Sequence, residues 1–100
     1  MSKGGHVYII TNNANNVLYT GVTSNLFVRI TEHREKKYPS SFSAKYNCNK
    51  LIYFQFLSSI EEAIELEKKI KNQKREWKIS LINKFNPNWT DLYSEIENFV

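Results

Sequence analysis

The sequence predicts a small α+β domain in which helices flank a three-stranded antiparallel sheet, with the elements in the order ββαβαα. Three observations support this fold class. The chain opens with two β-prone segments joined by an asparagine-rich turn, residues 51–57 form a nearly continuous apolar run, and a helix-capping sequence follows at Ser59. One hundred residues with 41% hydrophobic content suit a single domain with a modest core.

The first two strands are expected at residues 7–11 and 17–23, where β-branched and aromatic side chains dominate. The asparagines between them tolerate the left-handed backbone of a tight turn, so the two segments should form a β-hairpin. Each strand carries one tyrosine, Tyr8 or Tyr19. These tyrosines are either partners in one site or ordinary half-buried strand residues.

The pairing register decides between these interpretations, because side chains alternate across a strand. If Thr11 lies opposite Asn16, Tyr8 lies opposite Tyr19 and both point the same way. If Thr11 lies opposite Val17, the two tyrosines point apart. A site made of paired tyrosines therefore requires the first register.

The first helix is expected over residues 26–37, with Ser24 or Asn25 as its N-cap. Its apolar stripe is narrow, and Arg29 and His33 fall beside that stripe, one turn apart on the same flank. Most basic residues of a helix simply form a solvated face. Because Arg29 and His33 border the buried stripe, we expect both to reach toward one place in a cleft beside the sheet.

Residues 38–49 are rich in serine and asparagine and predict a loop that is longer than most connections in small domains. Within it, Lys45 and Tyr46 place a cation beside an aromatic ring, a pairing that can hold a phosphate and a base. Alternatively, Phe42 and Tyr46 anchor the loop in the core.

The apolar run at residues 51–57 predicts a central strand covered by helices. Ser59 and Glu62 then form a capping box, in which Ser59 is the N-cap and Glu62 the third helical residue. The helix that starts there should continue to about Asn72.

Glu67 is the most unusual residue of this helix, because at 100° per residue it falls inside the core-facing stripe. A carboxylate pointed at a core costs several kcal/mol unless it is paired or bound to a metal. Glu67 is therefore either a metal ligand or the partner of Arg29 or of a lysine. The apolar members of the stripe are Ile60, Ala63, Ile64, Leu66 and Ile70.

A last helix is expected at residues 74–85, ending at Asn86 and Pro87, with its apolar side chains packed inward. The basic residues around its start could follow a phosphate backbone. The side chains expected inward are Trp77, Leu81 and Ile82, the core should be closed by Trp89, Leu92 and Tyr93, and the candidate nucleic-acid contacts are Lys71, Arg75 and Lys78.

The chain divides into a flexible N-terminus at residues 1–5, one domain at residues 6–93 and an acidic C-terminal end at residues 94–100. The net charge is +4, but it is unevenly distributed. Residues 1–88 hold all 14 lysines and arginines and 7 acidic residues, whereas the charged residues among 89–100 are all acidic. A basic body with an acidic tail favours a polyanionic partner, most often nucleic acid.

The single cysteine, Cys48, excludes an internal disulfide and a cysteine-cluster zinc site. No apolar run is long enough to cross a membrane, and the first residues contain no hydrophobic signal region. We therefore expect a soluble, cytoplasmic protein without a membrane partner, and a monomer.

In these features the sequence resembles the GIY-YIG nuclease family, in particular small stand-alone bacterial YhbQ-like proteins. The resemblance covers roughly residues 6–93, and its strength lies in the ordered set of motifs, because each signature tripeptide alone is a weak signal. The corresponding positions are residues 7–9 (VYI), residues 19–21 (YTG), Arg29, His33, Glu67 and residues 86–93.

The resemblance implies metal-dependent hydrolysis of a nucleic-acid phosphodiester. In this scheme Glu67 binds Mg²⁺ or Mn²⁺, which polarises the scissile phosphate. Arg29 offsets charge on the phosphate oxygens, while Tyr8 or Tyr19 deprotonates or positions the attacking water. A phenol has a reference pKa near 10, so we expect Arg29, His33 and the metal to lower the pKa of the tyrosine.

The expected function is therefore that of an endonuclease acting on DNA, or on RNA, with structure selectivity or weak sequence specificity. The catalytic candidates are Tyr8, Tyr19, Arg29, His33 and Glu67. The alternative is a non-catalytic module that binds nucleic acid, because the two signature tripeptides read VYI and YTG here instead of GIY and YIG.

Overall fold

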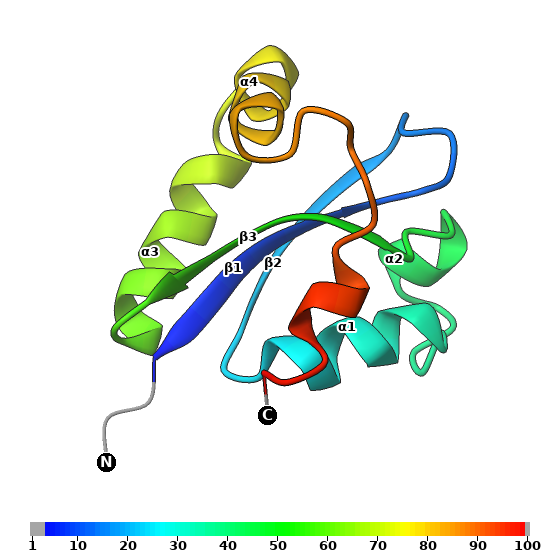
Figure 1. Ribbon diagram of the computed structural model, residues 1–100, viewed down its shortest axis with the longest axis horizontal. Coiled ribbons are helices and arrows are strands. Elements are labelled where there is room, and N and C mark those ends of the chain that lie inside the picture. The colour runs from blue at the N-terminus through cyan, green and yellow to red at the C-terminus, as the bar shows by residue number, and fades with distance from the viewer. Residues whose placement is uncertain (1–3, 100) are drawn as a thin grey trace.

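The computed structural model describes residues 4–99 and contains one antiparallel sheet with helices on both faces, so the predicted α+β class is confirmed (Figure 1). The strands are arranged in the order β2-β1-β3. The elements are β1 (Gly5–Thr11), β2 (Leu18–Thr23), α1 (Leu26–Arg34), α2 (Phe42–Lys45), β3 (Lys50–Leu57), α3 (Ile60–Lys71), α4 (Arg75–Phe85) and the 3₁₀ helix η1 (Tyr93–Ile96).

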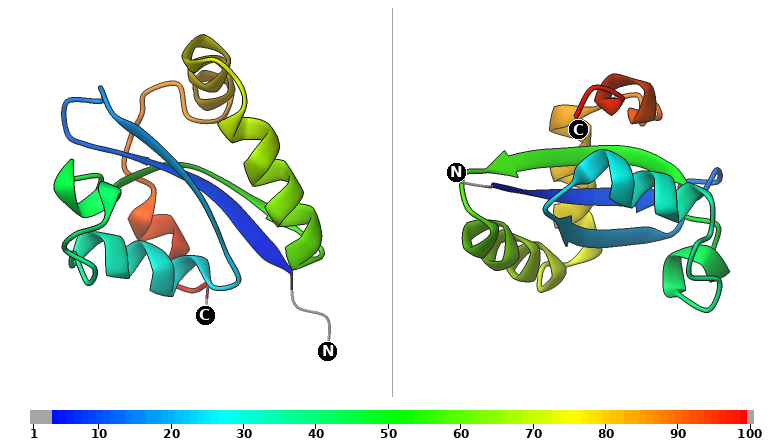
Figure 2. Two further views of the ribbon diagram at one scale, coloured as in Figure 1. Left: turned by 180° about the vertical axis from the view of Figure 1, so that it is seen from behind. Right: turned by 90° about the horizontal axis from the view of Figure 1, so that it is seen from below.

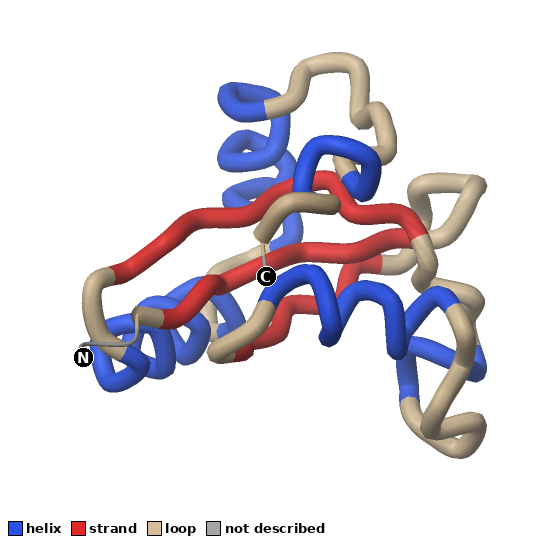
Figure 3. Tube along the Cα trace, turned by 60° about the horizontal axis from the view of Figure 1, so that its bottom comes forward, coloured by secondary structure: helices blue, strands red, loops and turns tan. Residues whose placement is uncertain are grey.

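The middle strand β1 is buried on both faces, because each face is covered by a different set of helices (Figure 2). Val7 and Ile9 pack against α3 and α4, whereas Tyr8 and Ile10 pack against α1 and η1. In Figure 3, η1 and α4 accordingly lie on opposite sides of β3. This two-sided burial explains why nearly every residue of β1 is apolar or aromatic.

The prediction that residues 51–57 form the central strand is wrong, because β3 pairs with β1 alone and lies at the edge. Its outer edge is nevertheless covered near Leu51, whose amide donates to Asp91 Oδ1 (3.2 Å) and whose carbonyl accepts from the Leu92 amide (2.8 Å). Only the far end of the strand is open, where Phe56 is 60% exposed. A covered edge therefore has the apolar composition that is typical of a central strand.

Helix α1 starts as predicted but ends three residues early. The side chain of Asn25 accepts a hydrogen bond from the Val28 amide (3.2 Å) and caps the helix. The last helical residue is Arg34 instead of Lys37, because Lys36 adopts a positive φ of 53° that a right-handed helix cannot continue through.

The predicted loop contains one short helix, α2, which the sequence did not indicate. Ser41 caps it by accepting from the Ala44 amide (3.3 Å). Phe42 and Tyr46 are each 48% exposed, so the alternative in which both rings anchor the loop in the core is wrong. The loop is instead held by buried Ser43 and Ala44.

Helix α3 begins with the predicted capping box, since Ser59 Oγ accepts from the Glu62 amide (3.1 Å). Ala63 and Ile70 are fully buried, but Ile64 of the predicted stripe is exposed. The contact surface of α3 is thus narrower than the apolar stripe, because the helix packs along one line across the sheet.

Helix α4 buries Ile82 and half-buries Leu81, whereas Trp77, which was also expected to point inward, is exposed. The reason is that α4 contacts the sheet mainly at β3, so its first turns extend beyond the core (Figure 1). At the C-terminal end, the packed core reaches Ile96, beyond residue 93 where the domain was expected to end.

At the other end, Gly5 belongs to β1 and is buried, which corrects the prediction of a flexible segment at residues 1–5 for this residue. Residues 1–3 of that segment lie outside the described residues. Within residues 4–99, no helix is long and apolar enough to cross a membrane.

Candidate active site

The two hairpin tyrosines lie on the same face of the sheet, but not in the register that was expected. Thr11 pairs with Leu18, so Tyr8 lies opposite Gly21 and Tyr19 lies opposite Ile10. This register differs by two residues from the one that places the tyrosines directly opposite each other, and a shift of two leaves every side chain on its face. The ring centroids of Tyr8 and Tyr19 are 6.4 Å apart. Neither of the two registers considered above is therefore present, and the paired site does not require Thr11 opposite Asn16, because the tyrosines share a face without it.

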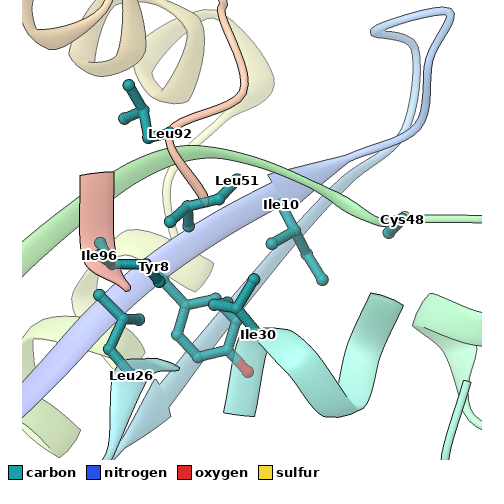
Figure 4. Packing of buried hydrophobic residues seen from close by; sticks show 8 residues of the cluster. All are labelled: Tyr8, Ile10, Leu26, Ile30, Cys48, Leu51, Leu92 and Ile96. Atoms are coloured by element: carbon teal, nitrogen blue, oxygen red, sulfur yellow. The ribbon is translucent and has the colours of Figure 1, made fainter. Parts of the chain in front are cut away.

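Gly21 makes room for the phenol of Tyr8. A Cβ atom at this position would lie 2.3 Å from Tyr8 Oη and 2.4 Å from its Cζ, closer than such atoms approach in proteins. The ring of Tyr8 extends from β1 toward α1 beside Leu26 and Ile30, with its oxygen at the α1 side (Figure 4). A residue with a side chain at position 21 would displace this oxygen.

A buried chain of hydrogen bonds starts at that oxygen. Tyr8 Oη is 2.8 Å from His33 Nε2, and His33 Nδ1 is 2.7 Å from Ser43 Oγ. All three residues are buried, with exposed fractions of 1%, 6% and 3%. We call Tyr8, His33 and Ser43 the relay.

Arg29 reaches the same phenol from the helical turn before His33, as the helical spacing predicted. Its charge and its hydrogen bond to Tyr8 both act to lower the pKa of the phenol. The guanidinium is also held by Glu32 Oε1 (3.0 Å), and its side chain is 28% exposed, so it lies at the boundary between core and solvent. The centroid of the Tyr38 ring lies 5.5 Å from the guanidinium carbon, and the side chain of Arg29 remains partly accessible beside it.

The pKa shifts of the relay differ from those expected. Burial raises the pKa of Tyr8, with a further increase from nearby Tyr19, and the opposing effect of Arg29 is too small to reverse it. Burial, reinforced by the charge of Arg29, lowers the pKa of His33 to about 4. Arg29 acts to lower the pKa of Tyr8, as expected, but desolvation outweighs it. The expectation is wrong for His33, which is neutral at pH 7.

The charge states fix the roles of the hydrogens. At pH 7 the Tyr8 hydroxyl is protonated and His33 is neutral, so the hydroxyl donates to Nε2 if that nitrogen carries no hydrogen. The relay can therefore pass the Tyr8 proton to His33 while Tyr8 takes up a second proton from outside. A phenol with a raised pKa and no such partner would not give up its proton.

Glu67 forms the other side of the site. Its side chain is only 13% exposed, and Oε2 lies 3.0 Å from Lys71 Nζ. Of the alternatives considered for this carboxylate, the structure contains the ion pair with a lysine and not one with Arg29. Lys71 Nζ also lies 5.9 Å from the centroid of Tyr19, and the charge of Glu67 contributes to the raised pKa of Tyr8. Glu67, Lys71 and the two tyrosines therefore share one region of the molecule.

Among the described residues, there is no group of three or more His, Cys, Asp or Glu side chains that could hold a metal ion alone. A single carboxylate is nevertheless a suitable donor set for Mg²⁺, which keeps several waters and is commonly bound through one or two carboxylates and the phosphates of its substrate. Glu67 already pairs with a cation, the ammonium of Lys71, through one carboxylate oxygen. The donor chemistry at Glu67 therefore fits Mg²⁺ or Mn²⁺ only when a phosphate supplies further oxygens.

The other candidate nucleic-acid contacts do not form one compact patch. Lys45 and Tyr46 lie exposed at the end of α2, where the Tyr46 ring is 4.7 Å from that of Phe42. Arg75 donates to the carbonyl of Asn16 in the hairpin turn (3.0 Å), and Lys78 is half-buried on α4. Lys71 is the only one of the five that contacts a candidate catalytic residue.

Two residues of this region were missed by sequence reasoning as site residues. Ser43 completes the relay, and Phe42 stacks on Tyr19 with ring centroids 6.0 Å apart. Neither has a periodic pattern around it. Ser41 is a residue type that favours N-caps, but Ala44 at the third helical position does not complete a capping box, so no clear signal for α2 is present in the sequence.

A known domain family and a known protein are similar to this chain in sequence. The family model for the GIY-YIG catalytic domain matches residues 4–88. The chain is also 34% identical over 87 residues to a UPF0213 protein of Syntrophus aciditrophicus (strain SB), and this match covers 87% of the chain and 97% of that protein. No solved structure matches the chain at a comparable level of significance.

Proposed function

Because the chain belongs to the GIY-YIG family, a family of nuclease domains, we propose that it is a metal-dependent endonuclease that hydrolyses DNA phosphodiester bonds. We further propose that it is structure-selective or weakly specific for sequence. The observation that carries the proposal is the convergence of three groups on one phenol: His33 at 2.8 Å, Arg29 by hydrogen bond and charge, and Glu67 by its charge.

In the proposed mechanism Tyr8 is the group that receives a proton from the attacking water. As the water loses a proton to Tyr8 Oη, the hydroxyl proton of Tyr8 passes to His33 Nε2, which is unprotonated at pH 7. Because the pKa of His33 is lowered, it holds this proton only transiently. The resulting hydroxide forms the new bond to phosphorus, and the bond to the leaving oxygen breaks. Tyr8 remains neutral throughout, so its raised pKa is no obstacle.

Tyr19 has a different part in this proposal. It is half-buried, stacks on Phe42 and lies beneath the ammonium of Lys71. No hydrogen-bond partner that could accept its proton lies within reach among the described residues, in contrast to Tyr8 and His33. We therefore assign Tyr19 to the positioning of the water or of a phosphate, and Tyr8 to proton transfer.

Arg29 is proposed to stabilise the charge that develops on the non-bridging oxygens of the phosphate. Its guanidinium is fixed by Glu32 and remains 28% exposed, so it is held in place before the substrate arrives. Such a preorganised charge raises the rate to the extent that it stabilises the transition state more strongly than the bound phosphate.

Glu67 is proposed to hold Mg²⁺ or Mn²⁺ together with oxygens of the bound phosphate. The metal would polarise the phosphate and stabilise the leaving oxygen. Lys71 would then lose its partner and be free to contact a phosphate. Lys45, Tyr46, Arg75 and Lys78 are proposed as further contacts to the DNA or to RNA.

A cleavage panel tests this function. The parent protein is incubated with Mg²⁺ or Mn²⁺ and linear, nicked, forked, four-way and single-stranded DNA, with Glu67→Gln and Arg29→Ala as matched variants. We expect products only with a divalent metal and a loss of about 10³-fold or more in each variant. Cleavage by both variants at the parent rate would refute the assignment.

A non-catalytic module that binds nucleic acid is the second candidate. It is favoured by the pairing of Glu67 with Lys71, since Lys71 neutralises the only proposed metal ligand. This candidate requires salt-sensitive binding of DNA or RNA by the parent without products at any metal concentration. An absence of binding to duplex, branched and single strands at low salt would exclude it.

A further inference from the structure

Both ring nitrogens of His33 are engaged inside the protein. Nε2 lies 2.8 Å from Tyr8 Oη, and Nδ1 lies 2.7 Å from Ser43 Oγ. A neutral imidazole carries one hydrogen, so one of these bonds is donated by the ring and the other is accepted. Which nitrogen carries the hydrogen decides whether His33 can take a proton from Tyr8.

The groups at the Tyr8 end allow one direction only. Arg29, the other partner of the phenol oxygen, is a donor without acceptor atoms. If His33 donated from Nε2, the Tyr8 hydroxyl would have no acceptor among the described residues, although Tyr8 is only 1% exposed. A buried donor without an acceptor is disfavoured, so the hydroxyl donates and Nε2 accepts.

The groups at the Ser43 end agree with this direction. With Nε2 as acceptor, Nδ1 carries the hydrogen and donates to Ser43 Oγ. The Ser43 hydroxyl then has Ser41 Oγ as its acceptor at 3.3 Å, and Ser41 Oγ itself accepts from the Ala44 amide. With this direction, the hydroxyl hydrogens of Tyr8 and Ser43 and the ring hydrogen of His33 each have an acceptor.

Helix α2 holds Ser43 in place for this contact. The cap at Ser41 sets the start of the helix, and the carbonyl of Ser43 accepts from the Cys48 amide at 2.8 Å. Ser43 is only 3% exposed, whereas the two residues before it, Ser41 and Phe42, are half-buried and exposed, respectively. The segment thus turns one hydroxyl inward toward His33 while its aromatic side chain points to solvent.

We propose that Ser43 is a positioning residue that holds His33 as the tautomer with its hydrogen on Nδ1, so that Nε2 faces Tyr8 as a proton acceptor. This proposal rests on the proposed role of Tyr8 in proton transfer, and it assigns a function to α2 that the hairpin and α1 do not supply. Ser43 does not touch the substrate. It acts through His33, and its hydroxyl also stabilises the imidazolium formed when Nε2 takes the proton of Tyr8.

The tautomer is measured directly by ¹⁵N NMR of the full chain at pH 7. The chain has two histidines, and His6→Asn identifies the signals of His33. We expect the hydrogen of His33 on Nδ1 in the parent and in Ser43→Thr, which keeps the hydroxyl. In Ser43→Ala we expect a mixture that includes the Nε2 tautomer. Finding Nε2 protonated in the parent would overturn the proposal without any activity measurement.

Cleavage kinetics provide the second readout. Ser43→Ala should lower kcat about 10-fold to 100-fold, the range that is typical when the partner of a functional histidine is removed, with KM unchanged and recovery in Ser43→Thr. Ala44→Gly is the matched control, because it loosens α2 but keeps the Ser43 hydroxyl that contacts His33. Equal losses of kcat in Ser43→Ala and Ala44→Gly, with an unchanged tautomer, would reduce Ser43 to a structural role and overturn the proposal.

The two readouts separate this proposal from the proposed function. If the parent shows the Nδ1 tautomer but cleaves no DNA, the endonuclease assignment fails while the hydrogen-bond direction stands. If the parent cleaves DNA but the tautomer is the same in the parent and in Ser43→Ala, the role of Ser43 fails and the endonuclease assignment stands.

Discussion

The two sides of the candidate site are built in different ways. The relay is buried, each of its polar atoms has a partner within the protein, and its residues come from β1, α1 and α2. The acidic side consists of Glu67 and Lys71 on α3 alone, and Lys71 is 49% exposed. A buried network is set before any ligand binds, whereas a single partly exposed ion pair can exchange its partner. The groups proposed for proton transfer are therefore preorganised in this fold, whereas the proposed site for metal and phosphate is left adjustable.

Removal of the phenol oxygen should have the largest effect and test the preorganised side. Tyr8→Phe should reduce cleavage by about 10²-fold to 10⁴-fold, because the proton acceptor is lost. It should also lower the free energy of unfolding by roughly 1–3 kcal/mol, since Nε2 of buried His33 loses its partner. Initial cleavage rates and urea unfolding measure both quantities.

Tyr19→Phe is the matched control for that variant, and we expect a smaller loss of rate with little change in stability. Larger effects of Tyr19→Phe than of Tyr8→Phe on cleavage would reverse the assignment of the two tyrosines. That result would also mean that Tyr19, beside Lys71, takes the proton instead of the relay.

The second prediction concerns pH and the buried state of His33. Its pKa is 6.5 in the unfolded chain and about 4 in the folded protein, so between these values the unfolded chain binds more protons. The free energy of unfolding should therefore fall as the pH is lowered from about 6.5 to 4, by up to about 3 kcal/mol. Urea unfolding at several pH values measures this slope.

His33→Gln should flatten the pH slope. The pKa of His6 is also lowered by burial, so His6→Asn should remove only a part of the slope. An equal pH dependence in the parent and in His33→Gln would contradict the buried, neutral state of the relay.

The third prediction tests how closely the relay is packed. Gly21→Ala should lower the free energy of unfolding by about 1–3 kcal/mol, because the added methyl group overlaps the Tyr8 phenol. The displaced oxygen should also reduce cleavage by about 10²-fold.

Gly5→Ala is the control for Gly21→Ala. Its Cβ would lie 2.7 Å from the flexible end of Ile60 on the α3 face of the sheet, away from Tyr8. We expect some loss of stability with cleavage near the parent rate at a temperature where both proteins are folded. A Gly21→Ala variant with parental cleavage would show that the position of the Tyr8 oxygen is not restricted.

The smallest effects are expected for Lys71, the exposed partner in the ion pair of the acidic side. Lys71→Met should change the free energy of unfolding by less than about 1 kcal/mol, since the ion pair is partly exposed. Mn²⁺ binding should become a few-fold tighter, and the salt slope of DNA binding should decrease by about 1. Lys68→Met, an exposed residue of the same helix, is the control for metal binding. Weaker Mn²⁺ binding in Lys71→Met than in Lys68→Met would contradict a metal site at Glu67.

The sequence indicated the parts of this fold that depend on local patterns. The capping box at Ser59, the cap at Ser24 or Asn25 and the β-prone composition of residues 7–11 each involve residues a few positions apart, and the elements that they predicted are present. The position of β3 was not, because residues 91–92 cover its edge from the far end of the chain. The hairpin register was also wrong, because the turn is two residues longer than assumed.

The same distinction applies to the site. The convergence of Arg29 and His33 on one place followed from helical spacing, and the buried carboxylate at position 67 followed from the apolar stripe. Ser43 could not be found in this way, because its contact with His33 depends on how the segment after α1 folds back over the sheet. The sign of the Tyr8 pKa shift also depends on burial, which no local pattern reports.

The cover on the edge of β3 has a consequence for self-association. Asp91 and Leu92 satisfy the amide and the carbonyl of Leu51, which would otherwise be open to a strand from another molecule. The exposed Phe56 lies farther along the same strand. A chain shortened before residue 91 would therefore combine a free backbone edge with an apolar side chain, and it should form strand-paired aggregates. The closing segment thus protects the sheet from its own copies, while the residues of the candidate active site lie on other elements.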